Sequence, residues 1–531
     1  MKNAFINNSD YRIKSDRYTL IKTSAGSYLG SVTQTGVSKF LGVDYGKAGR
    51  WEKAEFPQPF EGIKEALYYA DAPCQNPSDI TECMYDHGMS EDCLSVNIFE
   101  YEDGKKNKPV MVWFYGGAQL TGCNRGYTEF DFDGVNMITD NHDIVLVIAN
   151  YRLGFLGSAN LSVLDGYSDK YKYSNNLARL DTLLCLQWVK EYIEAFGGDP
   201  NNITAFGQSA GSNNITALML MDCAKGAFNK AILEESFAVG GKLVSLRDSE
   251  IVSTELFKKL GVTTVEEALA LPSVVILKAQ AEMIKEIRTG DPKFAEVKSL
   301  ALSPVIDNVV LFDDYWENLM SGKNCKDLKI MLGTNEGTFD DRMKMFGDFS
   351  KWEEALNLAL RQESRNYSQE TLNAYTKNYN RSAFNTARDL KNDSGMRVGA
   401  YVYANALSVL GEVYLYHFTY NDHTHSPSRA YHGIEIPVVF NNSSKARPEF
   451  VKAVQQAWLN FARTGNPNNE YLPVTWEKYT PENNNTMILD YDFRMVNGVK
   501  QKDIDLLIKY TREYQIPEFA NICEMNKKQE E

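Results

Sequence analysis

The stretch ITAFGQSAGSNNITALMLM, residues 203–221, constrains the fold of this chain more than any other. It joins a short apolar strand, a G-x-S-x-G pentapeptide and a run of helical composition. A sharp strand-to-helix turn at Ser209 leaves room only for tiny residues two positions away, and Gly207 and Gly211 meet that need. Such a turn lifts the serine hydroxyl above the sheet at a helix N-terminus, which favours negative charge. The context predicts Ser209 as a nucleophile; the alternative is a glycine-rich turn without chemistry.

The rest of the chain alternates apolar runs with helical segments. Continuous apolar strands that alternate with helices are typical of a mostly parallel sheet covered on both faces, so the predicted class is α/β. The expected strands are Val110–Tyr115, Asp143–Tyr151, Leu328–Gly333 and Glu412–Tyr420, and the expected helices include Arg179–Phe196 and Arg447–Pro467. No linker is apparent, so we expect one domain over residues 1–531. The segment from about Ser245 to Lys298 is rich in helix formers and predicts a helical insertion near the functional edge of the sheet.

Composition excludes several classes of partner. The 531 residues carry a formal net charge of −14, which argues against nucleic acid or an anionic membrane surface. The first residues lack the apolar region of a signal peptide, and the longest apolar runs are too short to span a bilayer. Eight cysteines without a C-x-x-C pair are typical of reduced thiols. We therefore expect a cytoplasmic protein that acts on a small molecule.

An activated serine needs a general base, and in this kind of fold the base follows the serine and the acid in the chain. Four histidines follow Ser209. His417 lies in an alternating strand, which favours a satisfied sheet histidine. His423 and His425 belong to the polar loop NDHTHSPS. His432 opens the segment HGIEIPVVF, where Gly433 allows the close turn that a loop histidine above a sheet needs, and it is the predicted base.

The acid and the oxyanion donors have candidates of their own. Glu336 follows an expected strand and precedes Gly337, a place where a site carboxylate lies on an open α/β sheet. The alternative for Glu336 is an exposed loop glutamate. The segment FYGGAQLTG follows the strand Val110–Tyr115, and its glycines let backbone N–H groups face an oxyanion without obstruction.

With these pieces in order, the sequence closely resembles the type-B carboxylesterase and cholinesterase family, and bacterial para-nitrobenzyl esterases are the nearest type. The resemblance covers almost the whole chain, through SEDCLSVNIF (Ser90–Phe99), NYRLGFLG (Asn150–Gly157), AFGGDPNNITAFGQSAG (Ala195–Gly211) and FARTGNP (Phe461–Pro467). It implies the α/β-hydrolase fold and hydrolysis of carboxylic esters without a metal or organic cofactor.

The resemblance also implies roles for individual residues. It assigns Ser209 as nucleophile, Glu336 as acid and His432 as base, with oxyanion donors on the backbone N–H groups of Gly117, Ala118 and Ala210. Polar supporting residues of the family fall on Ser236 and Glu435. Glu435 is also a rival for the acid, although a neighbour three residues from His432 rarely orients the same ring.

Several positions depart from the family pattern. Gln119 stands where the family often has an aromatic residue, Gln208 where many relatives have glutamate, and Phe237 where relatives usually have glycine. We expect all three to line the substrate pocket, and Phe237 to restrict the acyl group to short chains; the alternative places Phe237 in the core. Cys74 and Cys93 match a loop that secreted relatives close with a disulfide, and here we expect neighbouring, reduced thiols. That loop lacks the choline-binding tryptophan of cholinesterases, which argues against choline esters.

Two other functions compete with ester hydrolysis by a serine. The first is a catalytically silent binding protein of the same fold, as in neuronal adhesion relatives, which typically lose the nucleophile. The second is a metal-dependent hydrolase built on DHTH, Asp422–His425. The intact set Ser209, Glu336 and His432 argues against the first, and the lack of an apparent third ligand argues against the second.

Overall fold

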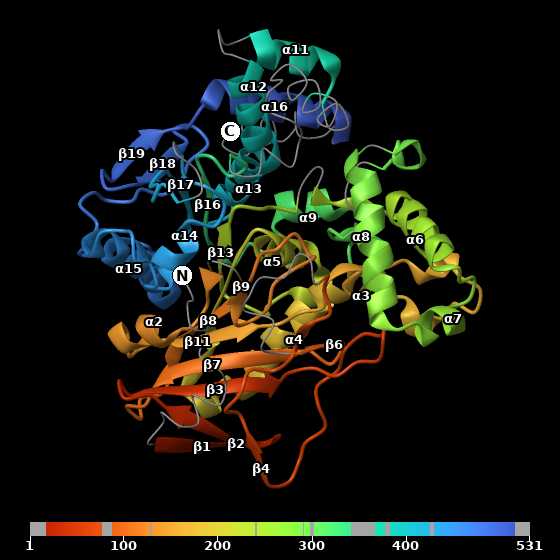
Figure 1. The fold of residues 1–531 in the computed structure, drawn as a ribbon. Helices are drawn as coiled ribbons and strands as arrows, with labels where there is room; N and C mark the ends of the chain where they lie inside the picture. The colour runs from red at the N-terminus through yellow and green to blue at the C-terminus, as the bar shows by residue number, and fades with distance from the viewer. Residues whose placement is uncertain are drawn as a thin grey trace. The chain divides into compact units, whose positions relative to one another are not determined.

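The computed structural model describes residues 17–76, 88–127, 130–238, 242–289, 291–297, 302–340, 360, 367–377, 383–424 and 429–515. The chain forms two compact units, and Figure 1 shows its course. Unit 1 comprises Met1–Glu234, Leu243–Ile330 and Glu435–Leu472. Unit 2 comprises Glu235–Lys242, Met331–Ile434 and Pro473–Glu531.

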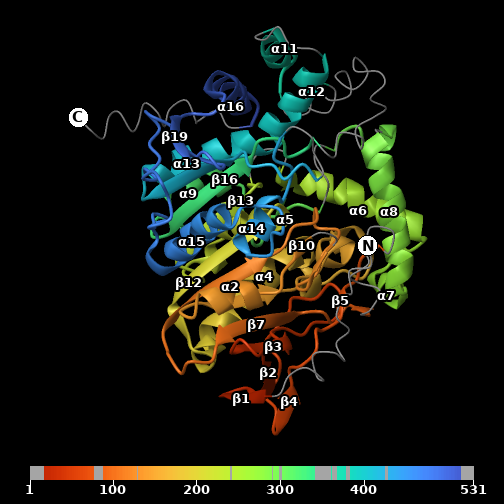
Figure 2. The same cartoon turned by 60° about the vertical axis from the view of Figure 1, so that its left-hand side comes forward.

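The strands of unit 1 follow one another side by side in a twisted sheet (Figures 1 and 2). Their order is β1 (Arg17–Thr23), β2 (Gly26–Val32), β3 (Val37–Asp44), β7 (Ser95–Tyr101), β11 (Val145–Ala149), β8 (Lys108–Phe114), β12 (Gly198–Gln208) and β13 (Lys230–Glu234). Pairing is antiparallel from β1 to β11 and parallel from β11 to β13. All residues of β11 and β13 are buried, because helices cover both faces of a parallel sheet.

Helices of unit 1 follow the strands that the sequence predicts. The main ones are α4 (Leu177–Tyr192), α5 (Ala210–Leu220) and α15 (Pro448–Thr464), with the short α2 (Val135–Asp140) after β8. Pro448 begins α15, and Gly465 ends it in the left-handed conformation with φ 82°. The predicted strands at β8 and β11 and the predicted helices at α4 and α15 are confirmed.

The segment expected to be a helical insertion contains α6 (Leu246–Leu260), α7 (Val265–Ala270) and α8 (Ser273–Thr289). Capping residues fix the start of the first two helices. Ser245 caps α6 by accepting from the Asp248 N–H, and Thr264 with Glu267 forms a capping box at α7. Figure 1 shows the three helices together in green. Among the described residues, no helix combines the length and apolar character needed to cross a bilayer.

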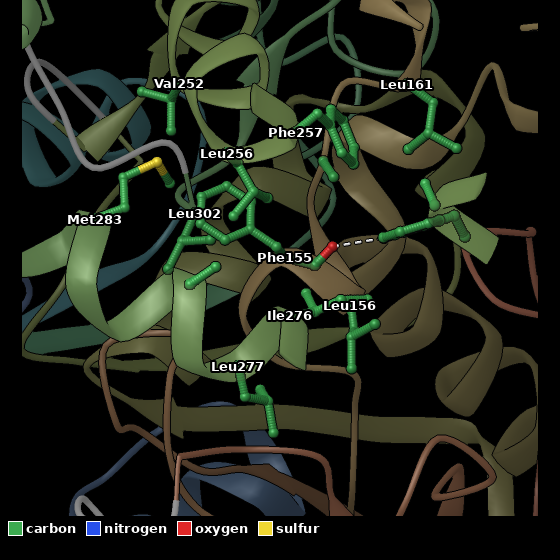
Figure 3. Close-up of a cluster of buried hydrophobic side chains, with 14 of the residues drawn as sticks. Phe155, Leu156, Leu161, Val252, Leu256, Phe257, Ile276, Leu277, Met283 and Leu302 are labelled. Atoms are coloured by element: carbon green, nitrogen blue, oxygen red, sulfur yellow. Dashed lines mark hydrogen bonds between the residues drawn. The ribbon is translucent and has the colours of Figure 1, made fainter. Parts of the chain in front are cut away.

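An apolar cluster attaches these helices to the rest of unit 1 (Figure 3). Leu256 and Phe257 of α6 and Met283 of α8 pack with Phe155 and Leu156 of the short helix α3 (Gly154–Gly157). The Trp51 indole N–H donates to the Phe155 carbonyl at 2.7 Å. Each fully buried side chain of this size contributes about 1.5–3 kcal/mol, so the insertion is an integral part of unit 1.

Unit 2 carries the second group of strands. β16 (Lys329–Asn335), which unit 2 enters at Met331, neighbours β17 (Val413–Phe418), followed by β18 (Asn485–Leu489) and β19 (Arg494–Asn497). β17 and β18 are parallel, and β18 and β19 are antiparallel. The helices of this unit are α11 (Gln369–Lys377), α12 (Ala383–Asn392), α13 (Val398–Ser408) and α16 (Gln501–Gln515). The predicted strands at β16 and β17 are confirmed.

Candidate active site

Ser209 occupies the turn between β12 and α5 in unit 1. Its backbone has φ 54° and ψ −119°, a conformation that costs a non-glycine residue on the order of 1–3 kcal/mol. Its N–H donates to the Glu234 carbonyl at 2.8 Å, which fixes the turn to the end of β13. The side chain is partly exposed. The serine therefore has the strained, accessible geometry of a nucleophile on a strand-to-helix elbow.

The two glycines beside this serine are sterically required. A Cβ added at Gly207 would lie 2.6 Å from the Phe114 carbonyl oxygen, and one at Gly211 would lie 1.8 Å from the same atom. Phe114 ends β8, so the elbow packs directly against the backbone that leads into the loop of Gly117 and Ala118. The spacing of the pentapeptide is thus explained by close approach of two backbones.

That loop presents unpaired backbone donors. Gly117 and Ala118 both have left-handed backbones, with φ 113° and 57°. The Gly117 carbonyl accepts from Thr121 at 3.1 Å, which closes the turn. Within the described part of the chain, the N–H groups of Gly117, Ala118 and Ala210 donate to no partner. The Ala210 N–H is unpaired because it opens α5, and N–H groups of this kind can stabilise an oxyanion.

The two glutamines expected in the pocket are buried, with Gln119 exposed by 5% and Gln208 by 1%. The Gln119 side-chain amide donates to the Ala210 carbonyl at 3.1 Å and to Asn214 Oδ1 at 2.7 Å. It thereby ties the loop of Gly117 to the first turn of α5. These two contacts bury the Gln119 amide between the loop and α5.

His432 lies in unit 2, and its ring contacts a carboxylate. Nδ1 of His432 is 2.5 Å from Oε2 of Glu235, and both side chains are buried. A histidine whose Nδ1 proton is held by a carboxylate presents Nε2 as a proton acceptor. The resemblance expected Glu336 in this place, and the structure instead pairs His432 with Glu235.

Glu235 is fixed from several sides. It follows β13 directly, has φ 63°, and its side chain is fully buried. Its Oε1 accepts from the Asn335 N–H at 2.6 Å and from the Thr338 hydroxyl. Its own N–H donates to the Gly333 carbonyl at 3.0 Å. Glu235 thus bridges the end of β16 and the ring of His432.

Glu336 lies one residue beyond β16 but faces other groups. Successive side chains along a strand alternate in direction, and Asn335 donates to the Tyr431 carbonyl, next to His432, at 2.9 Å. Glu336 is half-buried, and burial raises the pKa of its carboxyl, with Arg429 and Arg397 opposing that shift. Among the described residues, the Glu336 carboxylate makes no hydrogen bond to His432. Alternation therefore explains why the predicted acid lies away from the ring.

The other expected site residues are buried. Phe237 is 2% exposed, and its ring centroid is 5.7 Å from that of Tyr403. A Cβ at Gly399 of α13 would lie 3.1 Å from Phe237, so the ring packs closely on this helix. Ser236 is buried beside it in sequence, and Glu435 is buried at the start of α14 (Glu435–Val439) in unit 1.

The remaining histidines are placed as follows. His417 lies in β17 with Nδ1 3.1 Å from the Thr334 carbonyl, and burial holds its pKa well below the ordinary value. The predicted sheet histidine is confirmed. His423 is exposed and contacts Asn421, whereas His425 lies outside the described residues, so the hypothesis of a metal site at DHTH is not tested.

Cys74 and Cys93 are buried and carry free thiols. Both line one small cavity of unit 1, and burial raises the pKa of each thiol. High thiol pKa values disfavour the reactive thiolate, which fits the expected pair of neighbouring reduced cysteines.

A comparison with protein families shows the family to which the chain belongs. The model of the carboxylesterase family matches residues 17–507. The chain belongs to the carboxylesterase family. The para-nitrobenzyl esterase of Bacillus subtilis (strain 168) is 30% identical over 509 residues, which cover 90% of this chain and 96% of that protein. The human cocaine esterase is 26% identical over 513 residues, covering 85% of this chain and 84% of that protein.

Solved structures agree with this membership. A carboxylesterase of Geobacillus stearothermophilus superposes with a TM-score of 0.78 at 27% identity, covering 92% of this chain and all of that chain. A thermophilic PNB esterase gives 0.79 at 28% identity with the same coverage. This carboxylesterase thus has the α/β-hydrolase fold and is a serine hydrolase of carboxylic esters, in a family characterised by a Ser-His-Glu triad.

Proposed function

We propose that Ser209 and His432 are the nucleophile and general base of this carboxylesterase, and that the N–H groups of Gly117, Ala118 and Ala210 bind the oxyanion. The observation that carries the proposal is the strained, glycine-flanked elbow at Ser209. His432 Nε2 takes the proton from the Ser209 hydroxyl as its oxygen attacks the ester carbonyl carbon. The carbonyl π-electron pair moves to oxygen, and the oxyanion donors stabilise that charge.

The second half of the reaction uses the same groups. The tetrahedral intermediate collapses, the bond to the alcohol oxygen breaks, and protonated His432 returns its proton to the leaving alcohol. Water then attacks the acyl-enzyme with His432 as base, and the acid product leaves as Ser209 regains its proton. A carboxylate on Nδ1 holds the ring tautomer and stabilises the imidazolium. The steps need no metal or organic cofactor.

The substrate class we propose is small carboxylic esters with short acyl groups, about acetyl to butyryl. The bulky side chain of Phe237, three residues after β13, motivates this limit on the acyl group; its ring is 2% exposed and packs on Tyr403 of α13, so the competing outcome is a ring that belongs to the core and never meets substrate. We further propose that the protein acts in the cytosol, which its buried free thiols support. The net charge of −14 supports a small-molecule substrate over a nucleic acid.

The test is Ser209→Ala, with Ser212→Ala in the first turn of α5 as the matched control. With 4-nitrophenyl acetate, the Ser209 variant should lose roughly 10³-fold or more in kcat, by analogy with other serine hydrolases, and should fold normally. A fluorophosphonate probe should label the wild type and the control but not the Ser209 variant. Turnover near the wild-type level in Ser209→Ala would refute the assignment, and an unlabelled, inactive wild type would favour the silent binding protein.

A further inference from the structure

We infer that Glu235, and not Glu336, is the carboxylate that positions His432 in this enzyme. The inference rests on the proposed role of His432 as the general base. It moves the acid from the end of β16 to the end of β13, the strand that pairs directly with the nucleophile strand β12. Glu235 is a positioning residue, since it acts on the substrate only through the ring.

The contacts of Glu235 suit this role. One carboxylate oxygen accepts from the Asn335 N–H and the Thr338 hydroxyl, and the other lies 2.5 Å from His432 Nδ1. Donors on both oxygens favour the ionised form and fix its orientation. Because the side chain is fully buried, water cannot compete for these bonds. A fixed anion on Nδ1 is what a base needs to hold its tautomer and to bear a positive charge in the transition state.

The backbone gives a second, independent argument. Glu235 has φ 63°, which is unusual for a long side chain without special local hydrogen bonding. A residue in such a conformation persists only where its surroundings over-determine it, and such residues cluster at active sites. Here the N–H bond to the Gly333 carbonyl holds the turn, and the turn directs the carboxylate to the end of β16 and to His432.

The surroundings of Glu336 argue against it as the partner. The charges that act on its carboxyl are the cations Arg429, Arg397 and Lys500 and the carboxylate of Asp340, and its backbone carbonyl accepts from Arg397 at 3.3 Å. Arg429 in turn holds Asp340 at 2.6 Å, so these cations belong to a separate ionic cluster. Glu336 therefore borders that cluster and does not contact the ring.

The order of residues in the chain is compatible with Glu235 in place of Glu336 as the acid. Ser209, Glu235 and His432 follow the order nucleophile, acid, base that the fold requires, as Ser209, Glu336 and His432 do. Triads are recognised by geometry and roles rather than by sequence position. Geometry is therefore the criterion that separates the two carboxylates, and it selects Glu235.

The experiment compares three amide variants. Glu235→Gln should lower kcat by roughly 10³–10⁴-fold with little change in KM, by analogy with neutralising the orienting carboxylate of other triads. Glu336→Gln should stay within about tenfold of the wild type. Glu234→Gln is the matched control: it is the adjacent, equally buried glutamate, its Oε1 accepts from the Trp458 indole at 2.7 Å, and its amide can keep that bond. Glu235→Asp should recover part of the lost activity.

A proton NMR spectrum gives a readout that a merely structural role would not move. The wild type should show a strongly deshielded Nδ1 proton, which is lost in Glu235→Gln and kept in Glu336→Gln. A folded Glu336→Gln variant that loses 10³-fold activity, or loses this signal, would overturn the inference. If Glu235→Gln fails to fold, the activity and the NMR signal of Glu336→Gln still decide whether Glu336 is the partner of His432. Fluorophosphonate labelling of Ser209 reports separately on the proposed function, and the NMR signal tests the pairing even in an inactive wild type.

Discussion

Replacing Gly211 with alanine sets two opposing effects against each other at the nucleophile elbow. Gly211 lies in the first turn of α5, where helix propensity alone favours alanine by about 1 kcal/mol. The new Cβ, however, would lie 1.8 Å from the Phe114 carbonyl oxygen and 2.8 Å from that of Tyr115. Real Cβ atoms essentially never approach within 3.0 Å of such atoms, so the end of β8 must move by roughly 1 Å.

The expected cost follows from that displacement. Overpacking of this kind costs about 1–3 kcal/mol, which exceeds the propensity gain and should lower Tm by a few degrees. The larger effect should be on turnover, because the moving segment leads into the loop of Gly117 and Ala118. A 1 Å misplacement of groups that act on the transition state can cost roughly 10²-fold, so kcat should fall about a hundredfold.

The assay pairs thermal unfolding with hydrolysis of 4-nitrophenyl acetate. Gly49→Ala is the control, because its Cβ would lie 2.6 Å from the carboxylate at the flexible end of the Glu52 side chain, which can move away. We expect this control to keep both Tm and kcat. If Gly211→Ala were as stable and as active as the wild type, the steric account of the elbow would fail.

Three further predictions concern other parts of the chain. Phe237→Gly should extend the acyl range, since each excluded methylene is worth about 1–3 kcal/mol, and should lower stability by about 3–5 kcal/mol; an unchanged profile across 4-nitrophenyl esters from acetate to decanoate would contradict the acyl role. Asp181→Asn should cost roughly 3–5 kcal/mol in urea unfolding, because it leaves Arg152 buried without the carboxylate that it contacts at 2.6 and 2.8 Å; a cost below about 1 kcal/mol would contradict this. Burial raises the pKa of Glu336, so its contribution to stability is present below about pH 4.5 and is lost as the pH rises through the folded pKa; the Tm of the wild type relative to Glu336→Gln should therefore fall as the pH rises above about 4.5, and a constant difference would refute the shift.

Patterns with a strict steric or periodic basis were predictable from the sequence. The elbow at Ser209 depends on two glycines that the tightness of a strand-to-helix turn demands, and the structure shows the carbonyl that excludes larger residues. Apolar runs predicted β8, β11, β16 and β17 because burial on both faces leaves few other choices. Capping residues such as Ser245 and Gly465 set helix ends locally.

The carboxylate partner of His432 was harder to predict, because two glutamates hold equivalent places in the sequence and only the direction of the side chains separates them. Glu235 and Glu336 both stand directly after a strand, and both precede His432 in the chain. A rule that looks for a carboxylate just past a strand end favours the two glutamates equally. What distinguishes them is a positive φ at Glu235 and the direction of Asn335, neither of which a sequence pattern encodes. The burial of Phe237 against α13 likewise depends on a distant helix.

The contacts at the end of β13 limit where the chain can accept insertions and deletions. The Glu234 carbonyl holds the backbone of Ser209, and the carboxylate of the very next residue holds His432. Most exposed loops of a protein accept inserted residues at little cost. An insertion or deletion between Glu234 and Glu235 would change the attachment of the nucleophile and of the base in one event. This segment should therefore tolerate amino-acid substitutions at neighbouring positions far better than any insertion or deletion. A library of loop-length variants should leave this segment unchanged.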